Sequence, residues 1–274
     1  IQIAELFHQL HLTVPQVLAQ DTALGFLLLS DLGTRMYSDV LNSSDNSVQQ
    51  LYMDAIDSLI LLQTQSQPDV LPEYTRDFLQ REMGLFPEWY IGTHLGVTLT
   101  DEQNTSLNLV FDNLLANIMA QPQVFVHRDY HSRNLMVMQQ NNPGILDFQG
   151  ALYGPLTYDL VSLLRDAYVQ WDEEMVLDLA IRYWEKAKKA GLPVASDIDS
   201  FYRDFEFMGL QRHLKILGIF TRLAYRDGKQ DYLKDLPVVM SYVRKTAQRY
   251  NQLIPLLRLL DVLENSAPQV GYTF

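Results

Sequence analysis

Two short polar segments at a fixed separation constrain this chain more than any other feature. The first covers residues 126–134 (Val-His-Arg-Asp-Tyr-His-Ser-Arg-Asn), and the second covers residues 145–149 (Ile-Leu-Asp-Phe-Gln). Asp129 and Asn134 lie five positions apart, and Asp147 follows Asp129 by 18 positions. Short apolar runs flank both segments and have the length of strands. The pattern therefore predicts a strand-loop-strand arrangement that brings the three polar side chains together.

Two acids and an amide in this order have the chemistry that phosphoryl transfer from a nucleotide requires. A carboxylate must accept the proton of the attacking hydroxyl, and Asp129 is the candidate for this general base. Mg²⁺ prefers hard oxygen ligands, and Asn134 and Asp147 are the candidates to bind it. Each of the three residues, taken singly, also has a structural explanation as a turn or capping residue at a strand end.

Three basic or polar neighbours of the proposed base are further candidates. Arg133 is a second catalytic candidate because a cation beside the γ-phosphate stabilises its charge; a surface ion pair is the alternative. His127 is expected to brace the backbone of the loop. His131 is a candidate for substrate contact, and we do not expect it to bind zinc with His127, because that spacing requires a helix.

A nucleotide site is predicted around residues 30–33, where a strand is expected to leave a small lobe. Such a strand exposes one backbone edge, so the main chains of Ser30 and Leu32 are the candidates for contacts with adenine; a simple hairpin end is the alternative. Met136 and Leu146 are the candidates for the floor of the adenine pocket.

The charge and the missing residue types exclude other classes of function. A net charge of -12 argues against a protein that binds nucleic acid by neutralising phosphates. The absence of Cys excludes disulfides and thiolate metal sites. No apolar run is long enough to span a membrane, so we expect a cytoplasmic protein without membrane partners.

The first Gly is Gly25 and the first Lys is Lys186. We therefore expect either that the glycine-rich loop and the lysine strand of a small lobe are missing from this chain, or that it works without them.

The two polar segments resemble the catalytic and metal-binding loops of kinases, and they are similar to those of the aminoglycoside phosphotransferase and choline kinase family. His131 and Ser132 stand where protein kinases have Lys and Pro, and no Ala-Pro-Glu segment follows Asp147. Instead, Gly-Pro-Leu-Thr-Tyr-Asp-Leu at 154–160 comes almost at once. The resemblance implies ATP and Mg²⁺ as cofactors, and a nucleotide and a small molecule as partners.

The resemblance also implies a fold. It is an α+β, protein-kinase-like, two-lobed fold with a truncated small β lobe and a large, mainly helical lobe. Residues 1–33 are expected to form the remainder of the small lobe and the hinge, and residues 34–274 the helical lobe.

The patterns of apolar residues predict a helix over 1–12, a strand over 14–18 and a buried strand over 26–29. A polar break follows at 42–46. Further strands are expected at 124–127, 135–138 and 144–147. Helices are expected at 47–65, 75–90, 100–119, 156–168, 173–190, 196–226, 236–250 and 254–263.

Within the family, segments 127–134, 144–159 and 208–227 are most similar to bacterial kinases of cell-wall amino sugars. This resemblance implies phosphorylation of the anomeric hydroxyl of N-acetylmuramate or N-acetylglucosamine during peptidoglycan recycling. Gln149 replaces the Gly of Asp-Phe-Gly and is a candidate to present an amide to the substrate. Arg212 and Lys215 share one side of a helix with Arg222 and are candidates to receive a substrate carboxylate; a solvated helix face is the alternative.

Two other functions stay open from the sequence. An aminoglycoside or a choline-like amino-alcohol is the alternative substrate, although a polycation would favour a cleft lined with acids. A catalytically inactive, kinase-like binding protein is the second alternative, and the presence of all three polar residues argues against it.

Overall fold

The computed structural model describes residues 1–41 and 48–266, and it divides into two compact units. Unit 1 comprises Ile1–Tyr74 and Gln121–Phe205, and unit 2 comprises Thr75–Ala120 and Glu206–Phe274. The boundary expected near residue 33 separates a nucleotide lobe from the rest. The division into two compact units follows the contacts within each unit, so it does not test the lobe boundary near residue 33. That boundary stays a prediction. The polar break expected at 42–46 lies outside the described residues.

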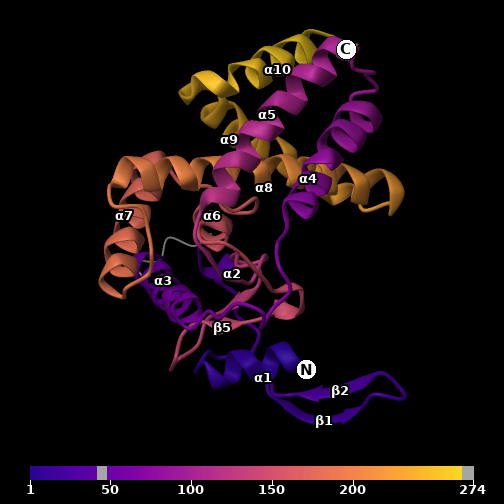
Figure 1. The fold of residues 1–274 in the computed structure, drawn as a ribbon. Coiled ribbons are helices and arrows are strands. Elements are labelled where there is room, and N and C mark those ends of the chain that lie inside the picture. Colours follow the sequence, from indigo (N-terminus) through magenta and orange to yellow (C-terminus); the bar gives the residue numbers. More distant parts are fainter. Residues whose placement is uncertain (42–47, 267–274) are drawn as a thin grey trace. The chain divides into compact units, whose positions relative to one another are not determined.

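Unit 1 begins with a helix and a hairpin, drawn in indigo in Figure 1. Helix α1 (Gln2–Gln9) confirms the expected first helix. Strands β1 (Val17–Asp21) and β2 (Phe26–Leu29) pair in antiparallel fashion, and the connecting turn contains Gly25 at a φ of 74°. The first strand therefore begins three residues later than expected.

The prediction that the strand over 26–29 is buried is wrong. Its four side chains are between 45% and 68% exposed. The reason is that β1 and β2 form a two-stranded sheet, and no third strand joins it in the part of the chain that the structure describes. A short apolar run indicates a strand, but it does not show whether other elements cover that strand.

The centre of unit 1 contains two more antiparallel pairs of short strands. Strand β3 (Gln123–Val126) pairs with β6 (Leu152–Pro155), and β4 (Leu135–Met136) pairs with β5 (Gly144–Ile145). The three expected strands are confirmed, β3 shifted by one residue and β4 and β5 shorter than expected. Strand β6 was not expected, because its Gly and Pro are typical of a turn before a helix.

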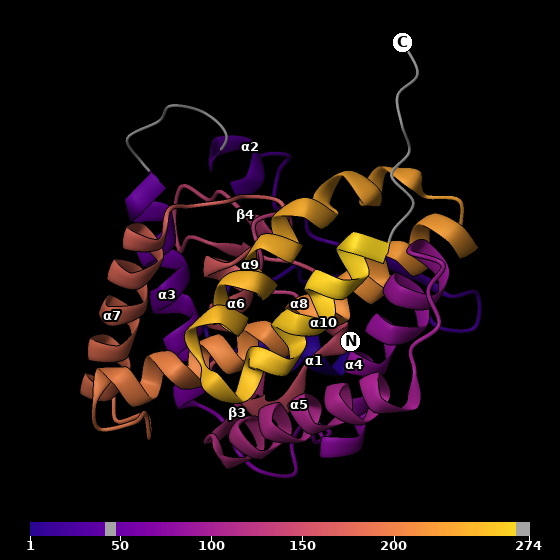
Figure 2. The same ribbon diagram turned by 90° about the horizontal axis from the view of Figure 1, so that it is seen from above.

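Five helices complete the described part of unit 1. They are α2 (Tyr37–Leu41), α3 (Val48–Thr64), α6 (Tyr158–Leu164), α7 (Glu173–Lys189) and the first part of α8 (Ile198–Arg226). Three of them, α3, α7 and α8, were predicted with nearly these bounds. Helices α3 and α7 lie side by side in Figure 1 and Figure 2. Helix α2 was not expected, and α6 is shorter than the predicted helix over 156–168. Every residue of α6 is buried.

All regular elements in the described part of unit 2 are helices, joined by loops such as residues 95–100. Its elements are α4 (Arg76–Leu85), the π-helix η1 (Phe86–His94), α5 (Asp101–Ala120), the remainder of α8, α9 (Leu236–Arg249) and α10 (Ile254–Ser266), with short 3₁₀ turns at Gln230–Asp235 and Asn251–Leu253. The expected capping box opens α5, since the Thr100 N–H donates to Gln103 Oε1 at 2.9 Å and the Gln103 N–H donates to Thr100 Oγ1 at 3.2 Å. No helix among the described residues combines the length and the apolar character that crossing a membrane requires.

Candidate active site

The loop between β3 and β4 folds back on itself around the main-chain carbonyl of Asp129. This carbonyl accepts a hydrogen bond from the His131 N–H at 3.0 Å. It also accepts one from the side-chain amide of Asn134 at 3.0 Å. The Asn134 N–H in turn donates to the His131 carbonyl at 2.9 Å. Asn134 is therefore held against the residue that the sequence predicts as the base.

The second polar segment is bonded directly to this loop. The Leu146 N–H donates to the Asn134 carbonyl at 2.9 Å, so Asp147 follows immediately after the point where the two segments meet. Asp147 has a φ of 61°, in the left-handed region, and its carboxylate accepts a hydrogen bond from the Gln149 side chain. The structure thus brings the backbones of both predicted metal ligands together.

The donor set at this junction fits Mg²⁺. The amide nitrogen of Asn134 is used by the Asp129 carbonyl, which turns the amide oxygen to the opposite side. The carboxylate of Asp147 is the exposed neighbour. No group of three His, Cys, Asp or Glu side chains within the described ranges is arranged to hold a metal ion alone. One carboxylate and one amide suit an ion that takes its remaining ligands from phosphates and water.

His127 connects the two segments from within the core. It is fully buried, its Nε2 lies 2.9 Å from the Leu146 carbonyl, and its Nδ1 accepts the Asp129 N–H at 3.2 Å. Burial lowers the pKa of the imidazole to about 4, although nearby acids such as Asp129 oppose the shift. The ring is therefore neutral near pH 7, with its proton on Nε2 as these two hydrogen bonds require.

Asp159 of α6 fixes the start of the catalytic loop. It is fully buried, and its two carboxylate oxygens accept the N–H of His127 at 2.6 Å and the N–H of Arg128 at 2.9 Å. Arg128 has a φ of 77°, a conformation that costs a non-glycine residue about 1 kcal/mol. The buried carboxylate stabilises this strained residue, which immediately precedes Asp129.

An aromatic cluster supports the same region from α1. Phe7 is fully buried, and its ring centroid lies 5.5 Å from that of Phe148 and 6.4 Å from that of His127. Phe148 directly follows Asp147. The first helix of the chain therefore packs against both polar segments at once.

The far end of the catalytic loop is held by Asp166. Its Oδ2 accepts the N–H of Ser132 at 3.0 Å and the Ser132 hydroxyl at 2.5 Å, and its Oδ1 accepts the Tyr168 N–H at 3.1 Å. The exposed Arg133 lies over the Tyr168 ring, with its guanidinium carbon 3.5 Å from the ring centroid. The ring of His131 lies nearly perpendicular to the Tyr168 ring, with 5.5 Å between their centroids. Two of the predicted site residues thus share one aromatic support.

The residues predicted for the nucleotide lie on both sides of Gly144. A Cβ atom at Gly144 would lie 3.0 Å from the Leu32 side chain and 3.1 Å from Met136, so these two side chains meet there. Leu146, two positions further on, is half-buried. The Ser30 N–H donates to the Gln16 carbonyl at 2.9 Å and is not a free donor. Any contact of Ser30 with adenine then rests on its carbonyl.

The two cations predicted for the substrate lie on the part of α8 that belongs to unit 2. Arg212 is 4% exposed and Lys215 is 8% exposed, so the alternative of a solvated helix face is wrong for both. Lys215 forms a buried ion pair with Glu82, with 2.9 Å between Nζ and Oε1. The helical spacing in the sequence indicated that Arg212 and Lys215 lie on one side of a helix. It did not predict that Lys215 pairs with Glu82 of α4.

Sequence reasoning missed Asp166, Tyr168 and Phe7 as parts of the site. The single usable signal was Asp166, an acid two positions after the mainly apolar segment 160–164. A lone carboxylate there is stable only if it finds hydrogen-bond donors. Phe7 carried no signal, because its spacing in α1 is that of an ordinary core residue.

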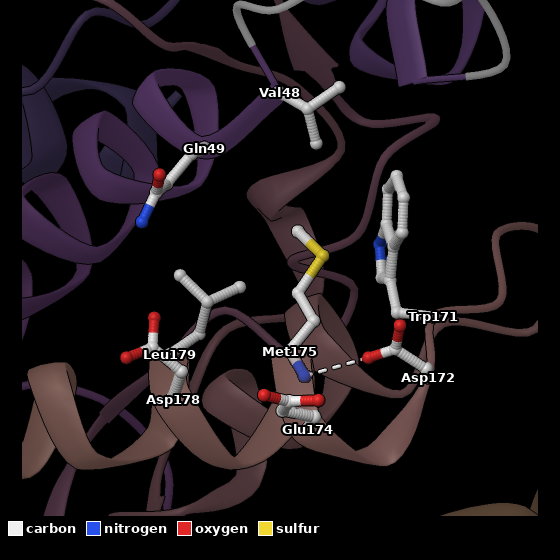
Figure 3. A pocket seen from close by; sticks show the side chains of 8 residues that line it. All are labelled: Val48, Gln49, Trp171, Asp172, Glu174, Met175, Asp178 and Leu179. Atoms are coloured by element: carbon white, nitrogen blue, oxygen red, sulfur yellow. Dashed lines mark hydrogen bonds between the residues drawn. The ribbon is translucent and has the colours of Figure 1, made fainter.

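A separate hollow of about 550 Å³ opens between the first turn of α3 and α7 in unit 1 (Figure 3). None of the site residues predicted from the sequence lines it. The Asp172 carboxylate at its edge accepts the Met175 N–H at 2.8 Å and caps α7. The lining residues are Val48, Gln49, Trp171, Asp172, Glu174, Met175, Asp178 and Leu179.

The geometry of the two loops agrees with the comparison to known families. Residues 1–194 match the family described as the phosphotransferase enzyme family. The chain belongs to this family. An N-acetylmuramate/N-acetylglucosamine kinase of Neisseria meningitidis is 48% identical over 277 residues, which cover 100% of this chain and 82% of the relative. A kinase of the same name from Pseudomonas putida is 45% identical over 254 residues, covering 93% of this chain and 74% of the relative.

Two similar solved structures confirm the fold. A choline/ethanolamine kinase family protein from Mesorhizobium loti matches with a TM-score of 0.64 at 13% identity, over 95% of this chain and 81% of that protein. The GDP complex of aminoglycoside 2'-phosphotransferase-IIIa matches with a TM-score of 0.59 at 15% identity, over 91% of this chain and 81% of that protein. The expected α+β, protein-kinase-like fold with few short strands is confirmed.

Proposed function

We propose that this chain catalyses the ATP-dependent phosphorylation of the anomeric hydroxyl of N-acetylmuramate and N-acetylglucosamine, a step of peptidoglycan recycling. The observation that carries the phosphotransfer is the bonded pair of loops, in which Asn134 meets both Asp129 and the residue before Asp147. The choice of sugar is supported by relatives named as kinases of these two sugars at 48% and 45% identity.

In the proposed reaction, Asp129 accepts the proton of the sugar hydroxyl. The hydroxyl oxygen forms a bond to the γ-phosphorus of ATP, and the bond to the bridging oxygen of ADP breaks. Asn134 and Asp147 would hold Mg²⁺, which neutralises charge on the polyphosphate when it is bound. The neutral His127 does not compete for the proton, and it keeps the backbone of Asp129 in place.

The remaining predicted residues take roles around this centre. Met136 and Leu146 would form the floor of the adenine pocket, with the Ser30 carbonyl and the main chain of Leu32 as the polar contacts. Arg133 would stabilise charge on the transferred group after leaving its position over the Tyr168 ring. His131 and Gln149 would contact the sugar, Gln149 through the amide that now meets Asp147. ATP as the phosphoryl donor favours a cytoplasmic location.

The test is turnover of wild type and of Asp129→Ala with ATP, Mg²⁺ and a panel of acceptors. We expect the wild type to phosphorylate the two amino sugars, and the variant to lose turnover while still binding nucleotide in calorimetry. Asp197→Asn is the matched control, because Asp197 is an exposed carboxylate outside the proposed site that accepts the Ser200 N–H at 2.8 Å.

Each alternative function predicts a different result on the same panel. Turnover of an aminoglycoside or an amino-alcohol in place of the sugars would replace the proposed substrate. Nucleotide binding without turnover of any acceptor would indicate a binding protein. Equal activity of wild type and Asp129→Ala would refute Asp129 as the base.

A further inference from the structure

The side chain of Gln149 holds one oxygen of a proposed metal ligand. Its Nε2 donates to Oδ1 of Asp147, and both residues are exposed. A carboxylate accepts hydrogen bonds, so the amide turns an N–H group toward Asp147 and its own oxygen away. Oδ2 of Asp147 accepts no hydrogen bond from the residues that the structure describes. One oxygen of this carboxylate is therefore held in place, and the other is open to a ligand.

The turn that brings the two side chains together is anchored in the core of unit 1. Residues Phe148–Gly150 form a 3₁₀ turn directly after Asp147. The ring of Phe148 packs against the buried Phe7, with 5.5 Å between centroids. Because the residue between them is fixed in this way, Asp147 and Gln149 stay within reach of each other. Their contact is thus a property of a short anchored turn.

A hydrogen bond to the second oxygen of a metal-binding carboxylate has a known effect. Mg²⁺ accepts oxygen ligands at about 2.1 Å in a nearly ideal octahedron, so a misdirected carboxylate binds it poorly. An exposed carboxylate rotates among several conformations, and each of the others must be given up when a metal binds. Residues around metal sites reduce this loss by hydrogen bonding to the ligands and fixing their orientation. Gln149 meets Asp147 in the way that such a residue requires.

We infer that Gln149 is a positioning residue of the metal site: by holding Oδ1 of Asp147, it presents Oδ2 to Mg²⁺. The inference rests on the proposed function, which assigns Asp147 to the metal. The amide keeps a second N–H and its oxygen, so the sugar contact proposed for Gln149 is compatible with this role. The inference also gives a use to the Gln that stands here in place of the Gly of Asp-Phe-Gly.

The experiment measures the dissociation constant of the Mn²⁺–ADP complex by calorimetry in wild type and in Gln149→Met. This variant keeps the length of the side chain and loses the amide. We expect it to bind Mn²⁺–ADP about 10-fold more weakly, the low end of the range for residues that support metal ligands, because Gln149 is exposed. Gln50→Met is the matched control, because Gln50 Nε2 donates in the same way to Oδ1 of Asp54 at 2.7 Å, on helix α3.

Two comparisons separate positioning from other roles. In an Asp147→Asn background, Gln149→Met should have no further effect on Mn²⁺–ADP binding, because Gln149 acts through Asp147. With EDTA present, ADP alone should bind wild type and Gln149→Met equally, and the two proteins should have the same thermal midpoint. A weaker affinity for metal-free ADP or a lower midpoint would indicate a role in the nucleotide site or in the fold and would overturn the inference.

The direction of the change is also decisive. Tighter binding of Mn²⁺–ADP to Gln149→Met would show that the amide competes with the metal, and unchanged binding would remove any role. A loss that persists in the Asp147→Asn background would make Gln149 a metal ligand in its own right. Each of these results overturns the inference, while phosphorylation of the two sugars by wild type would sustain the proposed function. A wild-type protein that phosphorylates no acceptor would overturn the proposed function, and this inference with it.

Discussion

Replacing Asp159 by Asn should loosen the catalytic loop without changing the shape of the side chain. The two carboxylate oxygens accept two buried N–H groups, of His127 at 2.6 Å and of Arg128 at 2.9 Å. An amide offers one oxygen, so one N–H would face an NH₂ group and lose its acceptor. Losing one charge-assisted hydrogen bond costs about 2 kcal/mol, and weakening the other adds about 1 kcal/mol. We therefore expect the free energy of unfolding to fall by about 3 kcal/mol.

The effect on catalysis should follow from the position of Arg128. Without its acceptor, this residue has no reason to keep a φ of 77°, and relaxation of its backbone would displace Asp129. A displacement of about 1 Å reduces turnover by about 100-fold.

Urea unfolding gives the stability change, and steady-state kinetics at saturating ATP and sugar give kcat. Asp197→Asn is the control, since an exposed Asn caps a helix as well as Asp does. An Asp159→Asn variant with wild-type stability and wild-type kcat would refute the assigned role.

Two further predictions concern the core. Burial lowers the pKa of His127 from 6.5 to about 4, so below pH 6.5 the unfolded chain binds a proton that the folded chain does not. The free energy of unfolding should therefore fall by about 3 kcal/mol between pH 6.5 and pH 4. The contribution of His127 is measured as the difference in this free energy between wild type and His127→Gln at each pH. An imidazole whose pKa in NMR lies near its ordinary value would contradict the prediction. A Cβ at Gly218 would lie 2.5 Å from the Leu85 backbone, whereas Gly84 has open space. In urea unfolding, Gly218→Ala should lower the free energy of unfolding by about 2 kcal/mol, and Gly84→Ala should raise it by about 0.5–1 kcal/mol. Changes of the same sign in both variants would contradict the close contact between Gly218 and Leu85.

The sequence predicted the helices because helices leave local patterns, and it proposed the reacting residues on the same kind of evidence. Thr100 and Gln103 form the expected capping box, and the periodic apolar residues of α3 and α7 give the expected helices. Asp129, Asn134 and Asp147 were proposed because phosphoryl transfer requires those residue types at that spacing, and their roles stay a prediction. The structure adds two hydrogen bonds of Asn134. Its side-chain amide donates to the Asp129 carbonyl, and its own carbonyl accepts the N–H of Leu146, the residue before Asp147.

The parts that could not be predicted depend on contacts between distant segments. The burial of β2 was wrong because it depends on whether other strands cover the hairpin. The partner of Lys215 lies more than 100 positions away on α4, and the support of the catalytic loop by Asp166 depends on how α6 ends. Neither relation has a periodicity or a motif that a single sequence reveals.

One peptide group, that of Leu146, serves both loops of the site. Its N–H reaches Asn134, and its carbonyl meets the ring of His127, which in turn holds Asp129. Any displacement of this peptide is therefore shared by Asp129, the proposed base, and by Asn134 and Asp147, the proposed metal ligands. Mutations that retune metal preference should also alter proton abstraction, so evolution in this enzyme would have to adjust the two properties together.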